Sequence, residues 1–303
     1  MHGRVTVIGG GHGVASVLRA LRDDPYALTV IVTVADDGGS SGELRRQAGG
    51  AAVGDLRRSL IALAGDDVAL ARAFARSLEI EGLGRHPLGN LMIRSIADAF
   101  GDLEAAVAWL GAELGIRARV VPATVDSVSL LAEAGREMIR GESAIGAANA
   151  TIRRLRFNPE RPRVSVTALE AVTGSDWVLL GPGSLFTSVL AVGALPDIAS
   201  ALMATSARIV WLCNLETQRA ETAGMSAWNH LAAIRRHGVR VDSVLYDPSA
   251  ELRFTAQQLG RAQVEGISRP LRNGHPGLHD PVLLRVALRE LFAAGERAVP
   301  LAV

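Results

Sequence analysis

The sequence predicts an α/β fold built on a doubly wound, mostly parallel sheet, with a small β-rich insertion. Short apolar runs alternate with amphipathic stretches along most of the chain, which is the pattern of consecutive β-α-β units. Residues 177–180 are continuously apolar, as expected for a strand that is covered on both faces. Polar or glycine-rich residues directly follow several apolar runs, and open α/β sheets bind their ligands at such strand ends.

The individual elements follow from the apolar runs and from the residues that begin or end them. Asp55 suits the N-cap of a helix, Gly65 suits its C-terminal end, and Asp280-Pro281 suits the start of the last helix. We expect strands at residues 5–8, 30–34, 177–180, 209–212 and 241–245. We expect helices at residues 14–21, 55–64, 88–100, 103–114 and 282–293.

The middle of the chain departs from this alternation. Residues 119–122, 128–133 and 138–140 have the composition of short strands around Gly135, and residues 151–157 alternate weakly. We therefore expect a single domain over residues 1–303, with an insertion or subdomain at about residues 118–163.

The composition argues against several classes of protein. The formal net charge of +1 gives no general attraction to nucleic acid or to an anionic membrane. All 32 basic residues are arginine, so neither a P-loop lysine nor a Schiff-base lysine is present. Cys213 is the only cysteine, which suits a reducing cytoplasm, and no apolar run of about 18 residues predicts a membrane span.

The run Asp36-Asp37-Gly38-Gly39-Ser40-Ser41-Gly42 gives the strongest indication of a ligand, because it follows the expected strand at residues 30–34. Glycines let backbone N–H groups approach a phosphate, and Ser40 and Ser41 add hydroxyl donors. A carboxylate here can hold a ribose hydroxyl or a divalent cation, and Mg²⁺ is the cation that we consider at Asp36 and Asp37. One of the two acids can instead form an Asx turn, and we prefer Asp37 as the functional one.

A glycine loop also follows the first expected strand. Gly10, Gly11 and Gly13 lie at the start of a helix, where exposed N–H groups and the helix dipole favour an anion. Asp36 lies 25 residues after Gly11, close to the spacing of a ribose-binding acid. Val14 stands where the dinucleotide-binding fingerprint has its third glycine, so a tight turn without a ligand is the alternative.

A second loop repeats this arrangement after residues 177–180. Gly181 and Gly183 permit close approach, and Ser184 offers a donor near the start of a helix. A well-capped connection between strand and helix is the alternative. Two such loops in one chain favour an extended ligand with more than one anionic or polar group.

Three further groups of polar residues are expected to face the same crevice, namely Asn214, Thr217 and Gln218, then Asp55 and Arg57, and finally Asn90. The first group can contact a base or sugar, and Arg57 can pair with a phosphate. A solvated loop and a helix cap are the alternatives. The histidines lack the spacing of a zinc site, and Ser184 lies outside the glycine-flanked elbow of an α/β hydrolase.

These motifs resemble the YvcK family, the gluconeogenesis factors of the CofD-like superfamily. The similarity extends over about residues 4–291 with order and spacing kept. It rests on the runs at residues 9–11, 32–42, 54–57, 88–91, 122–124, 140–143, 181–185, 187–188, 214–215, 217–218 and 221–222.

The resemblance implies a Rossmann-like fold and a cytoplasmic protein that binds UDP-sugars, notably UDP-N-acetylglucosamine. It also implies a role in cell shape and peptidoglycan production during growth on gluconeogenic carbon sources, and it assigns no catalytic residue. A homodimer and a partner protein of cell-wall synthesis are further expectations.

The CofD branch provides the alternative function, because its members transfer phospholactate from a guanosine diphosphate carrier to a deazaflavin alcohol with a divalent metal. Asp37 would be the catalytic candidate in such an enzyme. Gly54-Asp55-Leu56-Arg57 stands where that branch tends to have Pro-Asp-Leu-Asp, so the chain is more similar to the YvcK branch.

One departure from the YvcK pattern concerns the ligand directly. Leu278 stands where the family typically has an arginine implicated in sugar-nucleotide binding. Losing a charge-assisted contact weakens binding about ten- to a hundredfold, unless Arg272 or Arg219 replaces it.

Overall fold

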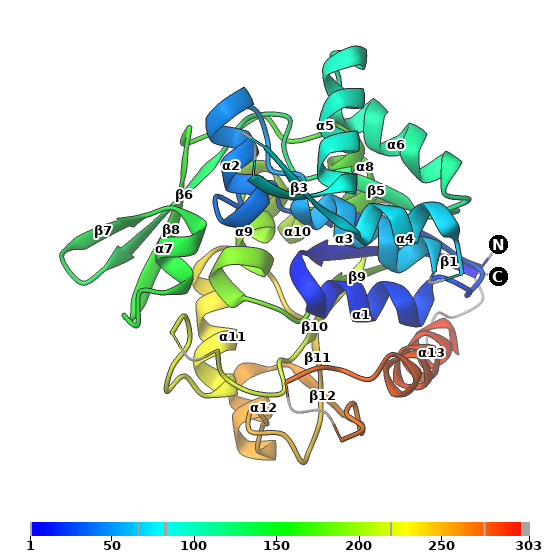
Figure 1. Ribbon diagram of the computed structural model, residues 1–303. Helices are drawn as coiled ribbons and strands as arrows, with labels where there is room; N and C mark the ends of the chain where they lie inside the picture. Colours follow the sequence, from blue (N-terminus) through cyan, green and yellow to red (C-terminus); the bar gives the residue numbers. More distant parts are fainter. Residues whose placement is uncertain (1, 66, 82–83, 219, 275–276, 298–303) are drawn as a thin grey trace.

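The computed structural model describes residues 2–65, 67–81, 84–218, 220–274 and 277–297. Its centre is a seven-stranded parallel sheet in the order β12-β11-β10-β9-β1-β2-β5 (Figure 1), so the predicted doubly wound α/β fold is confirmed. The strands are β1 (His2–Gly9), β2 (Tyr26–Val32), β5 (Arg119–Pro122), β9 (Trp177–Leu180), β10 (Arg208–Leu212), β11 (Ser243–Tyr246) and β12 (Glu265–Ser268).

The strand order reverses between β1 and β9. The chain proceeds from β1 through β2 to β5, returns to β9 on the other side of β1, and continues outward to β12. Val5 pairs with Trp177 and Ile8 with Leu180, so the two strands end side by side. The connections that follow them leave in opposite directions, which opens a crevice at their carboxyl ends.

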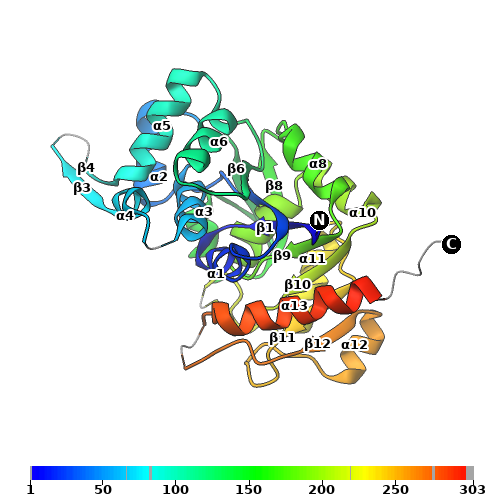
Figure 2. The same cartoon turned by 90° about the vertical axis from the view of Figure 1, so that its right-hand side faces the viewer.

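Helices cover both faces of the sheet (Figures 1 and 2). On one face α1 (Gly11–Leu21) packs against α3 (Gly54–Ala64) and α13 (Pro281–Arg297), and on the other α10 (Pro196–Ala204) packs against α8 (Val166–Gly174) and α9 (Leu190–Gly193). The remaining helices of this half are α11 (Ala227–Arg236) and α12 (Ala256–Ala262). Central strand residues such as Val7, Val30 and Leu179 are fully buried between these layers.

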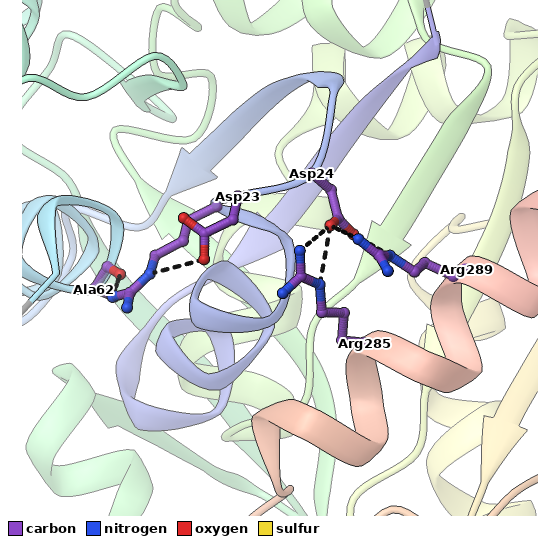
Figure 3. A network of polar contacts seen from close by, with 6 residues as sticks. Asp23, Asp24, Ala62, Arg285 and Arg289 are labelled. Carbon is purple, nitrogen blue, oxygen red and sulfur yellow. Dashed lines mark hydrogen bonds and ion pairs between the residues drawn. The ribbon is translucent and has the colours of Figure 1, made fainter.

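A buried acid fastens the last helix to the start of the chain (Figure 3). The side chain of Asp24 has no exposed surface, and its two oxygens accept hydrogen bonds from Nε of Arg285 (2.9 Å) and Nε of Arg289 (3.1 Å). Burial by itself would raise the pKa of Asp24, but the two guanidinium groups outweigh burial and hold the pKa below its usual value. The carboxylate therefore ties α13 to the segment that precedes β2.

The segment between β2 and β5 forms a mostly helical layer of its own. It contains α2 (Gly39–Ala48), α4 (Ala69–Ala75), β3 (Ser77–Ile80), β4 (Gly84–Pro87), α5 (Leu88–Phe100) and α6 (Leu103–Glu113). The helix expected at residues 88–100 has these bounds in the structure. The expected loop after Asp37 is shorter than its composition indicates, because α2 begins at Gly39.

A three-stranded antiparallel sheet forms an arm on the main body. It consists of β6 (Ser129–Ala134), β7 (Glu137–Arg140) and β8 (Ile152–Asn158), with α7 (Glu142–Gly146) between the last two. Figure 1 shows the arm projecting from the edge of the molecule. The expected insertion at residues 118–163 begins too early, because β5 pairs with β2 and belongs to the main sheet.

The length and apolar character of the helices bear on whether one of them could cross a membrane. Among the described residues, no single helix has the length and apolar character to cross a membrane. Taken together, the neighbouring helices Leu185–Gly193 and Pro196–Ala204 have the length and the apolar composition of a span, but the chain bends by 70° between them.

Candidate functional site

The first glycine loop is shaped by contacts with other loops. A Cβ atom at Gly10 would lie 2.3 Å from Oδ2 of Asp55, and one at Gly13 would lie 2.1 Å from the carbonyl oxygen of Pro182. Glycine is therefore required at both positions for the loops to approach. The N-cap residue of α1 is Gly10, which has no side chain to cap the helix, and the N–H of Gly11 in the first turn donates to the carboxyl group of Asp55. The other N–H groups of the first turn have no partner within the helix, and the positive end of the helix dipole lies at the crevice.

A cavity of about 290 Å³ lies at the switch point between β1 and β9. The loops after β1, β9 and β10 line it together, and a short segment before α13 completes its wall. The lining includes eight residues expected from the sequence, namely Gly10, Gly11, Gly13, Gly183, Ser184, Asn214, Thr217 and Gln218. It also includes His12, Pro182, Ser188, Leu215, Glu216, Gly277, Leu278 and His279.

Asn214 holds the second glycine loop in place. Its Nδ2 donates to the carbonyl oxygen of Gly183 (2.7 Å), and its Oδ1 accepts from the Gly183 N–H (3.2 Å). The amide therefore engages both backbone groups of Gly183. Its primary role in the structure is to set the loop, whereas the sequence suggested contact with a base or sugar.

Glu221 occupies the helix start that follows the second loop. The π-helix η1 (Leu185–Val189) begins there, and the N–H groups of Phe186 and Thr187 donate to Oε1 of Glu221 at 3.0 and 2.8 Å. Burial raises the pKa of this carboxyl, and the backbone donors lower it in part. A carboxyl group of the protein therefore lies at both helix starts, Glu221 at η1 with the N–H groups of Phe186 and Thr187, and Asp55 at α1 with the N–H of Gly11. Of the two, α1 opens onto a cavity through Gly11, His12 and Gly13.

The remaining polar groups of this cavity wall are linked to one another. The amide of Gln218 lies 2.8 Å from Oγ of Ser184, and the orientation that turns its nitrogen toward Glu221 satisfies both neighbours. Oγ1 of Thr217 donates to Oε1 of Glu251 at 3.0 Å. Ser184 and Thr217 therefore present an ordered polar wall to a ligand.

A second cavity of about 210 Å³ adjoins the first and shares four of its residues, namely Gly11, His12, Ser184 and Ser188. Three acids line it, and we call it the acid cavity: Asp36 after β2, Asp55 on α3 and Glu142 at the start of α7. Its other lining residues are Thr33, Arg58 and Thr187.

The acids of this cavity have unusual environments. Asp55 pairs with Arg58, but burial raises its pKa, and the charge of Asp36 adds to the effect. Burial raises the pKa of Glu142 to about 7, with the charges of Asp36 and Asp37 as the next causes. The acid cavity can therefore hold a proton near neutral pH.

The two adjacent acids of the strongest motif have different roles. Oδ2 of Asp37 accepts from the N–H of Glu142 (3.0 Å), and its Oδ1 accepts from the N–H of Ser143 (2.9 Å). Asp37 thus anchors the first turn of α7, while Asp36 makes an Asx turn to Gly38 (2.9 Å) and lines the acid cavity. The preference for Asp37 as the functional carboxylate stays a prediction, and the structure shows that each of its oxygens accepts a hydrogen bond from the backbone of the arm.

Asp55 also differs from its expected role as a helix cap. The helix begins one residue earlier, at Gly54, and no side chain caps it. The carboxylate points back to the first glycine loop instead, where Gly11 donates its backbone N–H to it. Asp55 therefore supports the loop that carries the start of α1.

Five other residues expected at the site line neither of these two cavities, namely Ser40, Ser41, Arg57, Asn90 and Gly181. Nδ2 of Asn90 donates to Oγ of Ser40 (2.9 Å), which lies 2.7 Å from Nδ1 of His86. This chain of contacts joins α5, α2 and β4. The three polar residues therefore hold the helical layer together beside the site.

The position of Asp37 bears on the expectation that Asp36 and Asp37 together hold Mg²⁺. Among the described residues, no group of three or more His, Cys, Asp or Glu side chains is placed to hold a metal ion. Mg²⁺ is often held by one or two carboxylates together with phosphate oxygens. Asp36 and Asp55, on one cavity, fit that arrangement better than the expected pair of Asp36 and Asp37.

Leu278, which stands where the YvcK family typically has an arginine, lies at the first cavity. Leu278 lines this cavity and is 50% exposed, so a longer side chain would have room there. Arg272 does not replace the arginine, because Nη2 donates to the carbonyl oxygen of Ser249 (2.7 Å) and Nε to its hydroxyl (3.3 Å). Arg219 lies outside the described residues.

Comparison with known proteins identifies the family. Residues 5–267 match the family described as 2-phospho-L-lactate transferase CofD. The chain belongs to the CofD family. Within it, a Mycobacterium tuberculosis relative named "Putative gluconeogenesis factor" is 38% identical, and the match covers 94% of this chain and 89% of the relative. The YvcK resemblance is therefore confirmed.

Other relatives agree with this assignment. Proteins of the same printed name from Deinococcus radiodurans and a Nostoc species are 37% and 40% identical, over 95% and 76% of this chain. The matches span 66% and 51% of those two relatives. A crystal structure of a UPF0052-family protein from Bacillus halodurans superposes with a TM-score of 0.90 at 33% identity, covering 96% of this chain and 99% of that one.

The sequence interpretation did not select Glu142, Arg58 and His12, which line the cavities, as residues of the site. The spacing of Asp55 and Arg58, three residues apart on a helix, was a usable signal for their pairing. Glu142 and Glu221 lie in the motif runs at residues 140–143 and 221–222, but no local pattern shows that they reach this region from the arm and from a loop distant in sequence.

Proposed function

We propose that this CofD-family chain binds a UDP-sugar, with UDP-N-acetylglucosamine as the first candidate, and acts as a regulator without catalysis of its own. The observation that carries the proposal is the cavity at the switch point, which is lined by Gly11, His12 and Gly13 at the start of α1. Such a helix start binds phosphate through its N–H groups and its dipole.

The two adjoining cavities suit the two parts of such a ligand. The diphosphate would lie against Gly11 and Gly13, with Ser184 and Thr217 on the facing wall. Carboxylates accept hydrogen bonds from hydroxyl groups, so Asp36 and Glu142 would receive ribose or sugar hydroxyls in the acid cavity. Membership of a family described by a phospholactate transferase supports a phosphorylated small molecule in general.

The proposed role follows the relatives named gluconeogenesis factors. A cytoplasmic protein that senses a UDP-sugar would adjust cell shape and peptidoglycan production during growth on gluconeogenic carbon sources. A homodimer and a partner protein of cell-wall synthesis are parts of this proposal, and the arm is the surface that we would assign to the partner.

Calorimetry with UDP-N-acetylglucosamine tests the proposal directly. We expect saturable heat with the native chain and a loss of at least tenfold in affinity for Gly13→Ala, because its Cβ would collide with the carbonyl of Pro182. Gly146→Ala is the matched control, since no atom lies within 4 Å of a Cβ there. Absence of both heat and thermal shift at millimolar ligand would overturn the proposal.

A transferase of the CofD type is the second candidate, favoured by the family description and by the acids beside the anion site. Acids of this kind can hold a divalent metal that neutralises charge on a transferring phosphoryl group. The test is product formation from a guanosine-diphosphate-linked lactate and the deazaflavin alcohol. Asp36→Asn should abolish it if the second candidate is right, and no product from the native chain would exclude that reaction.

A further inference from the structure

A third cavity, of about 490 Å³, lies at the opposite end of the sheet from the candidate site. The amino ends of β1, β2 and β5 form one wall, and the C-terminal part of α8 forms the other. Three arginines line it, Arg4, Arg117 and Arg119, together with a single acid, Glu170. We call it the rear arginine cavity.

Strand register brings two of the arginines, Arg4 and Arg119, to one face of the sheet. Arg4 pairs with Ala27, while Thr29 pairs with both Thr6 and Arg119. Side chains two residues apart on a strand share a face, so Arg4 lies on the face of Thr6. Arg117 precedes β5 and lines the same cavity from the loop before that strand.

The same face is the one covered by α8. Oγ1 of Thr6 donates to the carbonyl oxygen of Ala171 (3.1 Å) on that helix. Neighbouring strands are about 4.8 Å apart, so Thr6 and Arg119 are roughly 10 Å apart across β2. Arg4 lies two residues before Thr6, so its backbone is about 12 Å from that of Arg119, within the joint reach of two arginine side chains.

The guanidinium groups of these arginines are not committed to other partners. None of the three takes part in an ion pair or a side-chain hydrogen bond found among the described residues, whereas eleven ion pairs occur elsewhere. Arg4 is held through its backbone, whose N–H donates to Oδ2 of Asp176 (2.6 Å). Its Nη1 lies against α8, 3.3 Å from where a Cβ of Gly174 would be.

The negative end of α8 is partly neutralised where it meets this cavity. The carbonyl oxygen of Ala171 accepts hydrogen bonds from Oγ1 of Thr6 (3.1 Å) and from Oγ of Ser175 (2.7 Å). Helix C-termini otherwise repel anions. The lining thus combines three cations with one acid and with hydroxyl groups.

We propose that the rear arginine cavity binds a small oxyanion that carries two or more negative charges. Guanidinium forks match carboxylate and phosphate oxygens equally well, so the shared chemistry is a cluster of negatively charged oxygens. The volume is that of a small-molecule site and not of a macromolecular surface. The site is independent of the proposed UDP-sugar site, because it uses the other end of the strands.

Calorimetry with inorganic pyrophosphate and with citrate, each at millimolar concentration and low ionic strength, tests this inference. We expect saturable binding of at least one probe, and the responding probe distinguishes phosphate from carboxylate ligands. The double variant Arg117→Gln/Arg119→Gln should bind at least tenfold more weakly. Glu170→Gln should bind about threefold more tightly, because it removes the one acid of the lining.

Two further variants distinguish this site from the proposed UDP-sugar site at the carboxyl ends of the strands. Arg161→Gln removes an exposed arginine outside the cavity and should leave binding unchanged. Gly13→Ala alters the proposed UDP-sugar site, so pyrophosphate binding that is weakened by Gly13→Ala but not by the double variant would belong to that site and would overturn the inference. Urea unfolding of the double variant verifies that it folds. The inference is overturned if neither probe binds, or if the double variant binds as tightly as the native chain.

Discussion

Glu142→Gln tests the physical description of the acid cavity. Glu142 reaches this cavity from the arm, and Asp36 and Asp55 line the same space. Burial and the neighbouring carboxylates raise its pKa to about 7, from the ordinary value of 4.5. The native state therefore keeps a proton on Glu142 over a pH range in which the unfolded chain has released it.

The sign of the effect follows from this difference in bound protons. Between about pH 4.5 and 7 the native state binds more protons than the unfolded chain, so stability falls as the pH rises and the loss is complete above about pH 7. Each pKa unit is worth about 1.4 kcal/mol, which gives roughly 3 kcal/mol for the whole range. Partial exposure of Glu142 reduces this to about 2 kcal/mol through solvent screening.

Glutamine cannot ionise and resembles the protonated acid in shape. Urea unfolding should therefore give nearly equal free energies for the native chain and Glu142→Gln at pH 4, and a variant about 2 kcal/mol more stable at pH 8. Glu137→Gln, at an exposed position on the same arm, is the control and should show no such divergence. If the free energies of unfolding of the native chain and Glu142→Gln change in parallel with pH, the reasoning is refuted.

Three further predictions concern α13, the first loop and the family arginine. Asp24→Asn should lower the free energy of unfolding by about 3 kcal/mol at pH 7, measured by urea titration, because two guanidinium groups lose their buried partner. Since the pKa of Asp24 is lowered in the fold, that contribution is present at neutral pH and is lost as the pH falls below about 4; an undiminished native advantage at pH 2 would contradict it. Gly13→Ala should destabilise the chain by more than 1 kcal/mol relative to Gly146→Ala, and equal urea midpoints would show that the loops do not touch. Leu278→Arg should tighten UDP-N-acetylglucosamine binding about tenfold in calorimetry, and unchanged affinity would place the sugar nucleotide away from this wall.

The sequence located the loops of the candidate site better than it assigned their side chains. A glycine run after an apolar strand is a local signal, so the loops at Gly10 and Gly183 could be recognised without a structure. Asp36 and Asp37 are neighbours in sequence, and no local pattern shows which of them turns to the cavity. Contacts with α7 decide it, and α7 lies about a hundred residues later in the chain.

Glu221 illustrates the same limit for the second loop. Glycine and hydroxyl residues before a helix suggested an anion site at Ser184, and the local sequence supports that interpretation. The N–H groups of Phe186 and Thr187 are nevertheless taken by a carboxyl group that lies about 35 residues further on. Only the folded chain shows that this helix start is already occupied.

The sequence by itself determined the class of fold, the position of most strands and that of the helices α1, α3, α5, α6 and α13, because periodicity and capping depend on residues within about one helical turn. The tertiary structure decided the strand order, which places β1 beside β9 and makes β5 the edge of the main sheet. Strand order depends on which apolar faces pack against one another, and these faces come from residues far apart in sequence. Short-range sequence patterns therefore do not predict the order of the strands. The same long-range packing brings the start of α1, Ser184 and Asp36 around adjoining cavities.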